Sequence, residues 1–170
     1  GMVLIGALAA VAHADEPLQQ LNTEDLRIIW FHPAEDYLAP VVARSAENSL
    51  MFQKRIWGWT PDGKVNVLLK DFGDVGNAGA NSTPTNTVAI DIAPFAYSFE
   101  TYVGSERMFS LTNHEFVHVA NLDQWTQGDM FWRRLLGGKI QTDAKHPESL
   151  LYHYLTVPRS VVPRWYLEGL

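Results

Sequence analysis

Three short apolar runs in the first half of the chain predict β-strands. Residues 26–33 (LRIIWFHP) are rich in β-branched and aromatic side chains, and a proline ends the run. In residues 64–72 (KVNVLLKDF) apolar side chains recur at every second position, which is the period of a strand. Residues 87–94 (TVAIDIAP) have one apolar and one more polar side, as an edge strand does. Between the last two runs, residues 73–86 lack periodicity and predict a mobile loop.

Three- and four-residue spacings predict two long helices that alternate with these strands. Residues 35–59 carry apolar and small side chains at such steps; Asp36 can cap this helix and Gly58 can end it. Residues 105–123 (SERMFSLTNHEFVHVANLD) predict the second helix, with Ser105 as its N-cap. Shorter helices are expected in three later segments: residues 129–138, 146–156 and 157–170. This order predicts an α+β fold, in which a three-stranded layer is followed by helices.

Composition and charge are those of one globular domain without a nucleic-acid or membrane partner. The chain has 170 residues, of which 46% are hydrophobic and 19% charged, and it shows no internal repeat or linker. The net charge is −6 and no basic cluster exceeds two adjacent residues, which argues against nucleic acid or an anionic membrane as partner. Without cysteine, neither a disulfide framework nor a cysteine-type zinc site can form.

The first residues predict export. Residues 1–14 form an apolar run that ends in Ala12-His13-Ala14, the small-x-small pattern of a secretory cleavage site. We interpret this run as the remnant of a signal peptide on an exported protein, periplasmic or extracellular. The alternative is an amphipathic N-terminal helix. The run is too short to span a bilayer, so no membrane span is expected, and residues 15–170 then form the single folded domain.

The candidate chemistry lies in the second long helix, in the sequence His-Glu-Phe-Val-His. His114 and His118 are four residues apart, so both imidazoles leave the same helix face, where one divalent ion can join them. Glu115 borders that face and can hold a water without being a ligand, which is the mechanical reason for the His-Glu-x-x-His spacing. The alternative is that the two histidines straddle a helix surface and that Glu115 pairs with one of them.

A catalytic zinc needs a third protein ligand, and spacing alone leaves several downstream candidates. Asp123 follows His118 by five residues and points to one side of the face, so a supporting or capping role suits it better. His146 and His153 are seven residues apart and could share a helix face, although Pro147 places His146 in an N-terminal cap region. The candidates are Asp123, Asp129, Asp143, His146, Glu148, His153 and Glu168.

The tail of the chain singles out one of these candidates. The segments NHEFVH and WYLEG together resemble the gluzincin group of zinc metallopeptidases, the thermolysin-like and aminopeptidase-like superfamily. In that group the third ligand is a glutamate on a later helix, in a W-x-x-E-G context that residues 165–169 match. The resemblance implies that His114, His118 and Glu168 hold Zn²⁺. It also implies that Glu115 is the catalytic general base.

The resemblance extends to the layout of residues 26–170. The order strand, helix, strand, edge strand and active-site helix is that of a zincin-like N-terminal subdomain, a small mixed sheet packed on a long helix. In that family the edge strand pairs with the substrate backbone. By this resemblance residues 87–93 would hold an extended peptide, with Ala89, Ile90 and Asp91 as substrate-binding residues.

Two departures from the family pattern bear on completeness. His118 and Glu168 are 168 − 118 = 50 positions apart, more than in well-known gluzincins, so the short helices between them form an insertion. The chain ends two residues after Glu168, whereas the family places transition-state-stabilising residues further on. We therefore expect a C-terminally incomplete domain of a longer, exported bacterial protein, with a possible additional C-terminal domain.

These observations lead to a metallopeptidase hypothesis with two rivals. Zinc would lower the pKa of its water to about 7 and polarise the scissile carbonyl, and Glu115 would pass the water's proton to the leaving amine. The substrate would be a peptide or protein, and this fragment would be inactive or weakened. The first rival is a catalytically silent zincin-fold module that binds or scaffolds extended peptides. The second is a structural domain whose histidines are hydrogen-bonded in a surface cleft.

Overall fold

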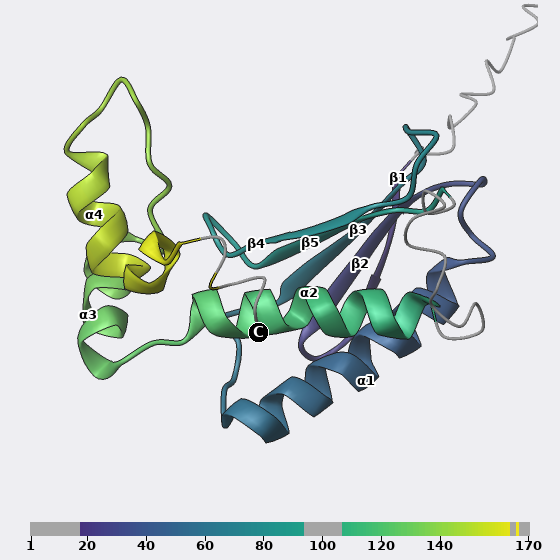
Figure 1. The fold of residues 1–170 in the computed structure, drawn as a ribbon, viewed down its shortest axis with the longest axis horizontal. Helices are drawn as coiled ribbons and strands as arrows, with labels where there is room; N and C mark the ends of the chain where they lie inside the picture. Colours follow the sequence, from purple (N-terminus) through teal and green to yellow (C-terminus); the bar gives the residue numbers. More distant parts are fainter. Residues whose placement is uncertain (1–17, 94–106, 164–165, 167–170) are drawn as a thin grey trace, which may run out of the picture.

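One mixed β-sheet with helices on one face organises the chain (Figure 1). The computed structural model describes residues 18–93, 107–163 and 166. Its five strands are β1 (Leu18–Asn22), β2 (Leu26–Phe31), β3 (Val65–Lys70), β4 (Ala78–Asn81) and β5 (Thr87–Asp91), in the order β1-β2-β3-β5-β4. β2, β3 and β5 run parallel, while β1 and β4 are antiparallel to their neighbours. The predicted α+β class is confirmed, with two strands more than expected.

The three strands predicted from the sequence occupy the centre of the sheet, and the two missed strands are its edges. β3 alternates buried and partly exposed residues along its length, as its pattern predicted. All five residues of β1 are exposed, and β4 reads Ala-Gly-Ala-Asn, so neither has an alternating apolar pattern. Their conformation comes from pairing with β2 and β5, which no local pattern encodes. The prediction of a loop over residues 73–86 is wrong because β4 lies within it.

The prediction that residues 87–94 form an edge strand is also wrong. β5 pairs with β3 on one side and with β4 on the other, so its backbone has strand neighbours on both sides. Its side chains still alternate between a buried and an open face, which is the pattern that suggested an edge. Alternation reports the two faces of a sheet and carries no information on whether a strand has one neighbour or two.

Helix α1 (Ala39–Trp57) begins after Asp36, which does not cap it. Asp36 instead accepts a hydrogen bond from the indole N–H of Trp30 at 2.7 Å and lies 2.7 Å from Nδ1 of His32. The Trp30 hydrogen bond, assisted by His32, holds the pKa of the Asp36 carboxyl below its usual value. Gly58 ends the helix as predicted, in the left-handed conformation with φ of 59°.

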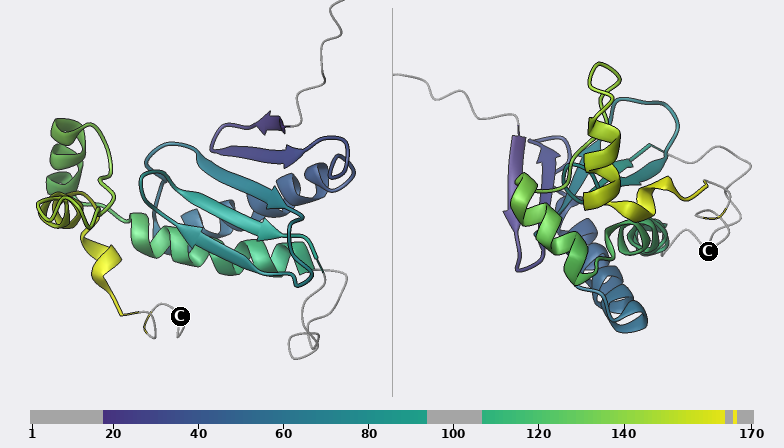
Figure 2. Two further views of the ribbon diagram at one scale, coloured as in Figure 1. Left: turned by 90° about the horizontal axis from the view of Figure 1, so that it is seen from above. Right: turned by 90° about the vertical axis from the view of Figure 1, so that its left-hand side faces the viewer.

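Helix α2 (Arg107–Asp123) lies beside α1 on the same face of the sheet (Figures 1 and 2). Small polar side chains line the contact, and Ser49 Oγ and Thr112 Oγ1 are 2.9 Å apart. One turn further along α1, Gln53 Nε2 donates to Asn113 Oδ1 at 2.9 Å. The small residues predicted on the middle of α1 therefore let α2 approach closely while their polar groups stay hydrogen-bonded.

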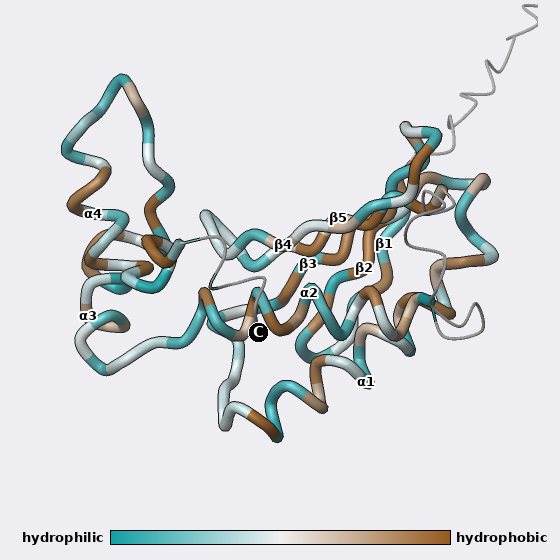
Figure 3. The backbone as a smooth tube through the Cα atoms, viewed as in Figure 1, coloured by the Kyte–Doolittle hydropathy of each residue, from teal (hydrophilic) through white to brown (hydrophobic). Residues whose placement is uncertain are grey.

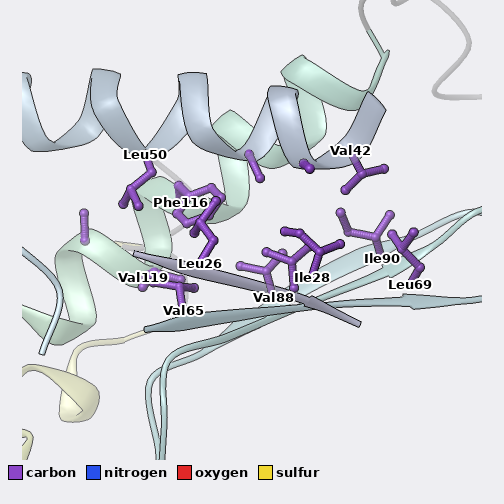
Figure 4. Close-up of a cluster of buried hydrophobic side chains, with 14 of the residues drawn as sticks. Leu26, Ile28, Val42, Leu50, Val65, Leu69, Val88, Ile90, Phe116 and Val119 are labelled. Carbon is purple, nitrogen blue, oxygen red and sulfur yellow. The ribbon is translucent and has the colours of Figure 1, made fainter. Parts of the chain in front are cut away.

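A buried apolar layer fills the space between the sheet and the two helices (Figure 4). Hydrophobic residues are concentrated in the central strands (Figure 3), and those of their inner face are fully buried. Leu50 of α1 and Phe116 of α2 close the layer from the helix side. The strand residues are Leu26, Ile28, Val65, Val67, Leu69, Val88 and Ile90.

Beyond α2 the chain leaves the sheet and forms short helices at one end of the molecule (Figure 1). They are α3 (Gln127–Leu136), α4 (Ser149–Thr156) and the 3₁₀ helix η3 (Pro158–Val161). We call residues 124–161 the helical excursion. α3 starts two residues before its predicted start at residue 129 because Thr126 and Asp129 form a capping box. Gly137 ends α3 as predicted, with φ of 82°.

No helix among the described residues is long and apolar enough to cross a membrane. The export signal predicted for residues 1–14 lies outside the described residues. The same holds for Ser105, the predicted N-cap of α2.

Replacing Phe116 with alanine tests the packing of α2 on the sheet. Phe116 is fully buried, so Phe116→Ala is expected to lower the free energy of unfolding by about 3–5 kcal/mol in urea denaturation. Phe131 of α3 is 58% exposed, and Phe131→Ala is the matched control, with an expected change within about 0.5 kcal/mol. Equal losses in the two variants would contradict this assignment of the core.

Candidate metal centre

His114 and His118 project from the same face of α2, one helical turn apart. Their Nε2 atoms are 3.1 Å apart and their ring planes are inclined at 87°. His114 is exposed and His118 partly exposed, whereas Phe116 and Val119 of the same helix are fully buried. The helical period therefore separates the histidine face from the core face, as the spacing predicted.

The separation of the two ring nitrogens fits two ligands of one zinc ion. Nitrogens bound at about 2.0–2.1 Å in a tetrahedral site lie about 3.3–3.4 Å from each other. The separation of 3.1 Å is therefore short of that value by only a few tenths of an ångström. A single N–H···N hydrogen bond has a similar length, so the pair suits a metal and also the hydrogen-bonded alternative.

Glu115 lies at the border between the histidine face and the core face of α2. Successive residues of a helix differ by about 100° around its axis, which places Glu115 one step from His114. His114 is exposed, but Glu115 is only 5% exposed. A carboxylate in this position is shielded from bulk solvent and still adjoins the candidate ligands, which is the position that the motif requires of a general base.

Among the described residues, no group of three histidine, aspartate or glutamate side chains could hold a metal ion. Six of the seven candidate third ligands are described: Asp123, Asp129, Asp143, His146, Glu148 and His153. Asp129 belongs to the capping box of α3, and His146 Nδ1 lies 3.2 Å from Glu148 Oε1. Glu168 lies outside the described residues, so its role as third ligand stays a prediction.

His153 is engaged inside the helical excursion. Its Nδ1 is 2.6 Å from the carbonyl oxygen of Ile140, and its Nε2 contacts Ser160 Oγ. The suggestion that His146 and His153 share a helix face is wrong, because α4 begins only at Ser149. Both ring nitrogens of His153 thus serve to join α4, η3 and the chain near Ile140.

Asp123, the last residue of α2, is the centre of a buried polar cluster. Its side chain is 0% exposed. Oδ1 accepts from Lys139 Nζ at 2.7 Å and from Arg133 Nη1 at 3.2 Å. Oδ2 accepts from Asn86 Nδ2 at 2.7 Å and from the backbone N–H of Asp62 at 3.0 Å. These contacts of Asp123 include neither a bond to another candidate ligand nor a helix cap; its carboxylate instead links segments that are far apart in the sequence.

Two cations offset the cost of burying this carboxylate. A negative charge at the C-terminal end of a helix is disfavoured by the helix dipole, and burial adds a further cost. Arg133 and Lys139 are themselves buried, and Arg133 Nη1 also pairs with Asp62 Oδ2 at 3.0 Å. Sequence reasoning missed Asn86, Arg133 and Lys139. The available signal was Asp123 itself, because an acidic residue at a helix C-terminus needs nearby cations.

Burial lowers the pKa of the Lys139 ammonium group from its ordinary value of 10.5, and the charge of Asp123 opposes this shift. Lys139 Nζ keeps two partners, Asp123 Oδ1 and Asn86 Oδ1, each at 2.7 Å. The Lys139 ammonium group is therefore hydrogen-bonded, but burying its positive charge costs free energy.

β4, and not β5, is the edge strand next to α2 (Figure 1). The backbone pairing that the sequence interpretation gave to Ala89, Ile90 and Asp91 is occupied by β4: Ala78 faces Ile90 and Gly79 faces Ala89. Any extended partner of the sheet on this side would meet β4 first.

A comparison of the chain with protein-family models, with curated proteins and with solved structures found no match.

Replacing Lys139 with methionine tests the buried cluster. Lys139→Met removes one of the two cations on Asp123, so we expect the free energy of unfolding to fall by about 3 kcal/mol near neutral pH. Lys145 is exposed, and Lys145→Met should change it by no more than about 0.5 kcal/mol. Urea denaturation of both variants measures the difference, and equal effects would contradict the buried pair.

The same variants report the lowered pKa of Lys139. Because the folded pKa lies below the unfolded value, the unfolded chain binds more protons at pH values between the two. The contribution of Lys139 to stability therefore rises with pH in the window below 10.5 and is lost as the pH falls through the folded pKa. The stability difference between wild type and Lys139→Met should grow across this window; a constant difference would refute the shift.

Proposed function

We propose that the chain is a zincin-like domain of a zinc-dependent metallopeptidase of the gluzincin type, acting on peptides or proteins outside the cytoplasm. The observation that carries this proposal is the His114–His118 pair, whose Nε2 atoms are 3.1 Å apart on the open face of α2. Glu168 would supply the third ligand. The buried Glu115 beside His114 and the edge strand β4 beside α2 support the same reading.

The residues of α2 would divide the chemistry between them. When bound, zinc supplies Lewis-acid chemistry that makes a water more acidic and polarises the carbonyl of a peptide bond. His114 and His118 would bind the ion through their Nε2 atoms. The Glu115 carboxylate would accept a proton from the attacking water and deliver it to the leaving amine nitrogen. This returns Glu115 to its starting charge after each cycle.

The substrate backbone would pair with the outer edge of β4. In the described residues the outer edge of β4 has no strand neighbour. The inner edge of β4 is paired with β5. An extended peptide that adds to a sheet edge gains main-chain hydrogen bonds, and its side chains point alternately to the two faces. The small side chains of β4 leave space for those of a peptide. We therefore propose that Ala78–Asn81, in place of Ala89, Ile90 and Asp91, bind the substrate backbone.

Metal binding is the first test. Isothermal titration of the protein with Zn²⁺ is expected to show one site. His114→Ala and His118→Ala should weaken it more than about 100-fold, since even groups that merely orient a ligand contribute about 10–100-fold. Glu168→Ala should weaken binding as well.

His146 provides the control for these variants. It is exposed and lies outside α2, so His146→Ala should leave zinc affinity unchanged. If His114→Ala and His146→Ala bound zinc equally well, the assignment of His114 as a zinc ligand would be wrong. If the wild type bound no zinc, the structural alternative would be favoured.

In the full-length protein, Glu115→Gln tests the general base separately from the metal. The amide keeps the size of the side chain but cannot accept the proton, so zinc affinity should persist while peptide hydrolysis falls at least about 100-fold. Glu148→Gln is a matched change of an exposed carboxylate and should keep full activity. Undiminished hydrolysis in Glu115→Gln would refute the assignment. Zinc and peptide binding without hydrolysis in the wild type would favour the silent peptide-binding module.

A further inference from the structure

Asn86 joins the β4–β5 hairpin to the C-terminal end of α2. It is the residue immediately before β5, and its side chain is buried, with 1% exposure. Its amide Nδ2 donates to Asp123 Oδ2 and its Oδ1 accepts from Lys139 Nζ, each at 2.7 Å. The amide nitrogen and the amide oxygen of Asn86 are therefore both hydrogen-bonded to charged side chains that lie outside the hairpin.

The edge strand β4 is held to β5 by backbone pairing, whereas its own side chains are small. β4 is four residues long, and only the small side chains of Ala78 and Ala80 pack against the core. The turn that follows is shaped by Asn81 Oδ1, which accepts from the backbone N–H of Thr83 at 3.0 Å. The turn then reaches Asn86, where the hairpin meets Asp123. The buried amide of Asn86 thus adds a direct side-chain link from the hairpin to α2, which the backbone pairing of β4 with β5 does not supply.

A second contact lies at the opposite end of α2. Arg107, the first residue of the helix, donates from Nη2 to the carbonyl oxygen of Ala93, just beyond β5. α2 therefore contacts the hairpin region at both of its ends, through Arg107 and Asp123. His114 and His118 lie between these two contacts. These two contacts oppose a shift of α2 relative to the β4–β5 hairpin.

We propose that Asn86, together with Asp123 and Lys139, positions β4 relative to the histidine pair, and that Asn86 is a positioning residue for the extended peptide. This inference rests on the proposed function. A displacement of about 1 Å between a bound substrate and the reacting groups can cost about 100-fold in rate. The amide is specific for this place, because a carboxylate would face Asp123 with a like charge, and an apolar side chain would take one hydrogen-bond partner from Asp123 and one from Lys139.

Asn86→Ala is the decisive variant, and Asn66→Ala is its matched control. Asn66 Nδ2 donates to Thr85 Oγ1 in the same turn at 3.3 Å but does not reach α2. Val67→Ala, in the centre of the sheet, serves as a control for loss of stability alone, since Val67 is fully buried. Each variant is made in the full-length protein and measured by hydrogen exchange, by zinc titration and by steady-state hydrolysis of a mixed peptide library.

In Asn86→Ala the amides of residues 78–81 should exchange at least about tenfold faster relative to those of β3. Zinc affinity should stay unchanged, and kcat/KM should fall about 100-fold, mainly through KM. Asn66→Ala should match the wild type in all three measurements. Asn86→Ser, whose hydroxyl can still donate to Asp123, should give exchange rates and kcat/KM values between those of Asn86→Ala and the wild type. It replaces Asn86→Ala in the experiment if that variant does not fold.

The outcomes separate this inference from the proposed function. Exchange that rises uniformly in Asn86→Ala, as in Val67→Ala, would overturn the positioning of β4. Faster exchange of β4 with an unchanged KM would overturn the role in peptide binding. A full-length wild type that binds no zinc or hydrolyses no peptide would overturn the proposed function and with it the peptide role, while the exchange data would still decide whether Asn86 positions β4.

Discussion

The packing of α2 against the sheet is the contact on which the other features depend. The register that buries Phe116 also aims both imidazoles, because a helix with 3.6 residues per turn cannot rotate one face without the other. Turning His114 and His118 elsewhere would bring Phe116 into water. Ser49 and Gln53 of α1 hold the helix from its other flank through hydrogen bonds to Thr112 and Asn113. The geometry of the candidate site is thus set by the hydrophobic core.

A second constraint acts at the end of the same helix. The Asp123 carboxylate is buried where the helix dipole disfavours it, and it is stable there because four groups from four segments converge on its two oxygens. Such a cluster is more specific than an apolar contact, because each partner must arrive with the correct charge and direction. The apolar core brings the layers together, and this cluster defines how their ends are aligned.

The parts that the sequence predicted are those that local patterns encode. The alternation of β3, the glycine that ends α1 and the shared face of His114 and His118 all follow from residues near in sequence. β1 and β4 were missed because pairing alone makes them strands, and for the same reason β5 was mistaken for an edge. Asn86 and Asp123 are 37 residues apart, and no periodicity reports a contact over such a distance. The third ligand, Glu168, rests on the family resemblance alone.

The long segment after His118 reads in the sequence as an insertion, an addition that a shorter relative could omit. In the folded chain this segment, the helical excursion, is part of the structural support of α2. Its residues Arg133 and Lys139 are the counterions of the Asp123 carboxylate. A chain that lost this segment would lose both cations beside Asp123 and keep only the neutral donors from Asn86 and the backbone of Asp62. The segment and the aspartate therefore depend on each other for stability: the segment supplies the cations that the buried carboxylate needs, and the carboxylate fixes the position of those cations.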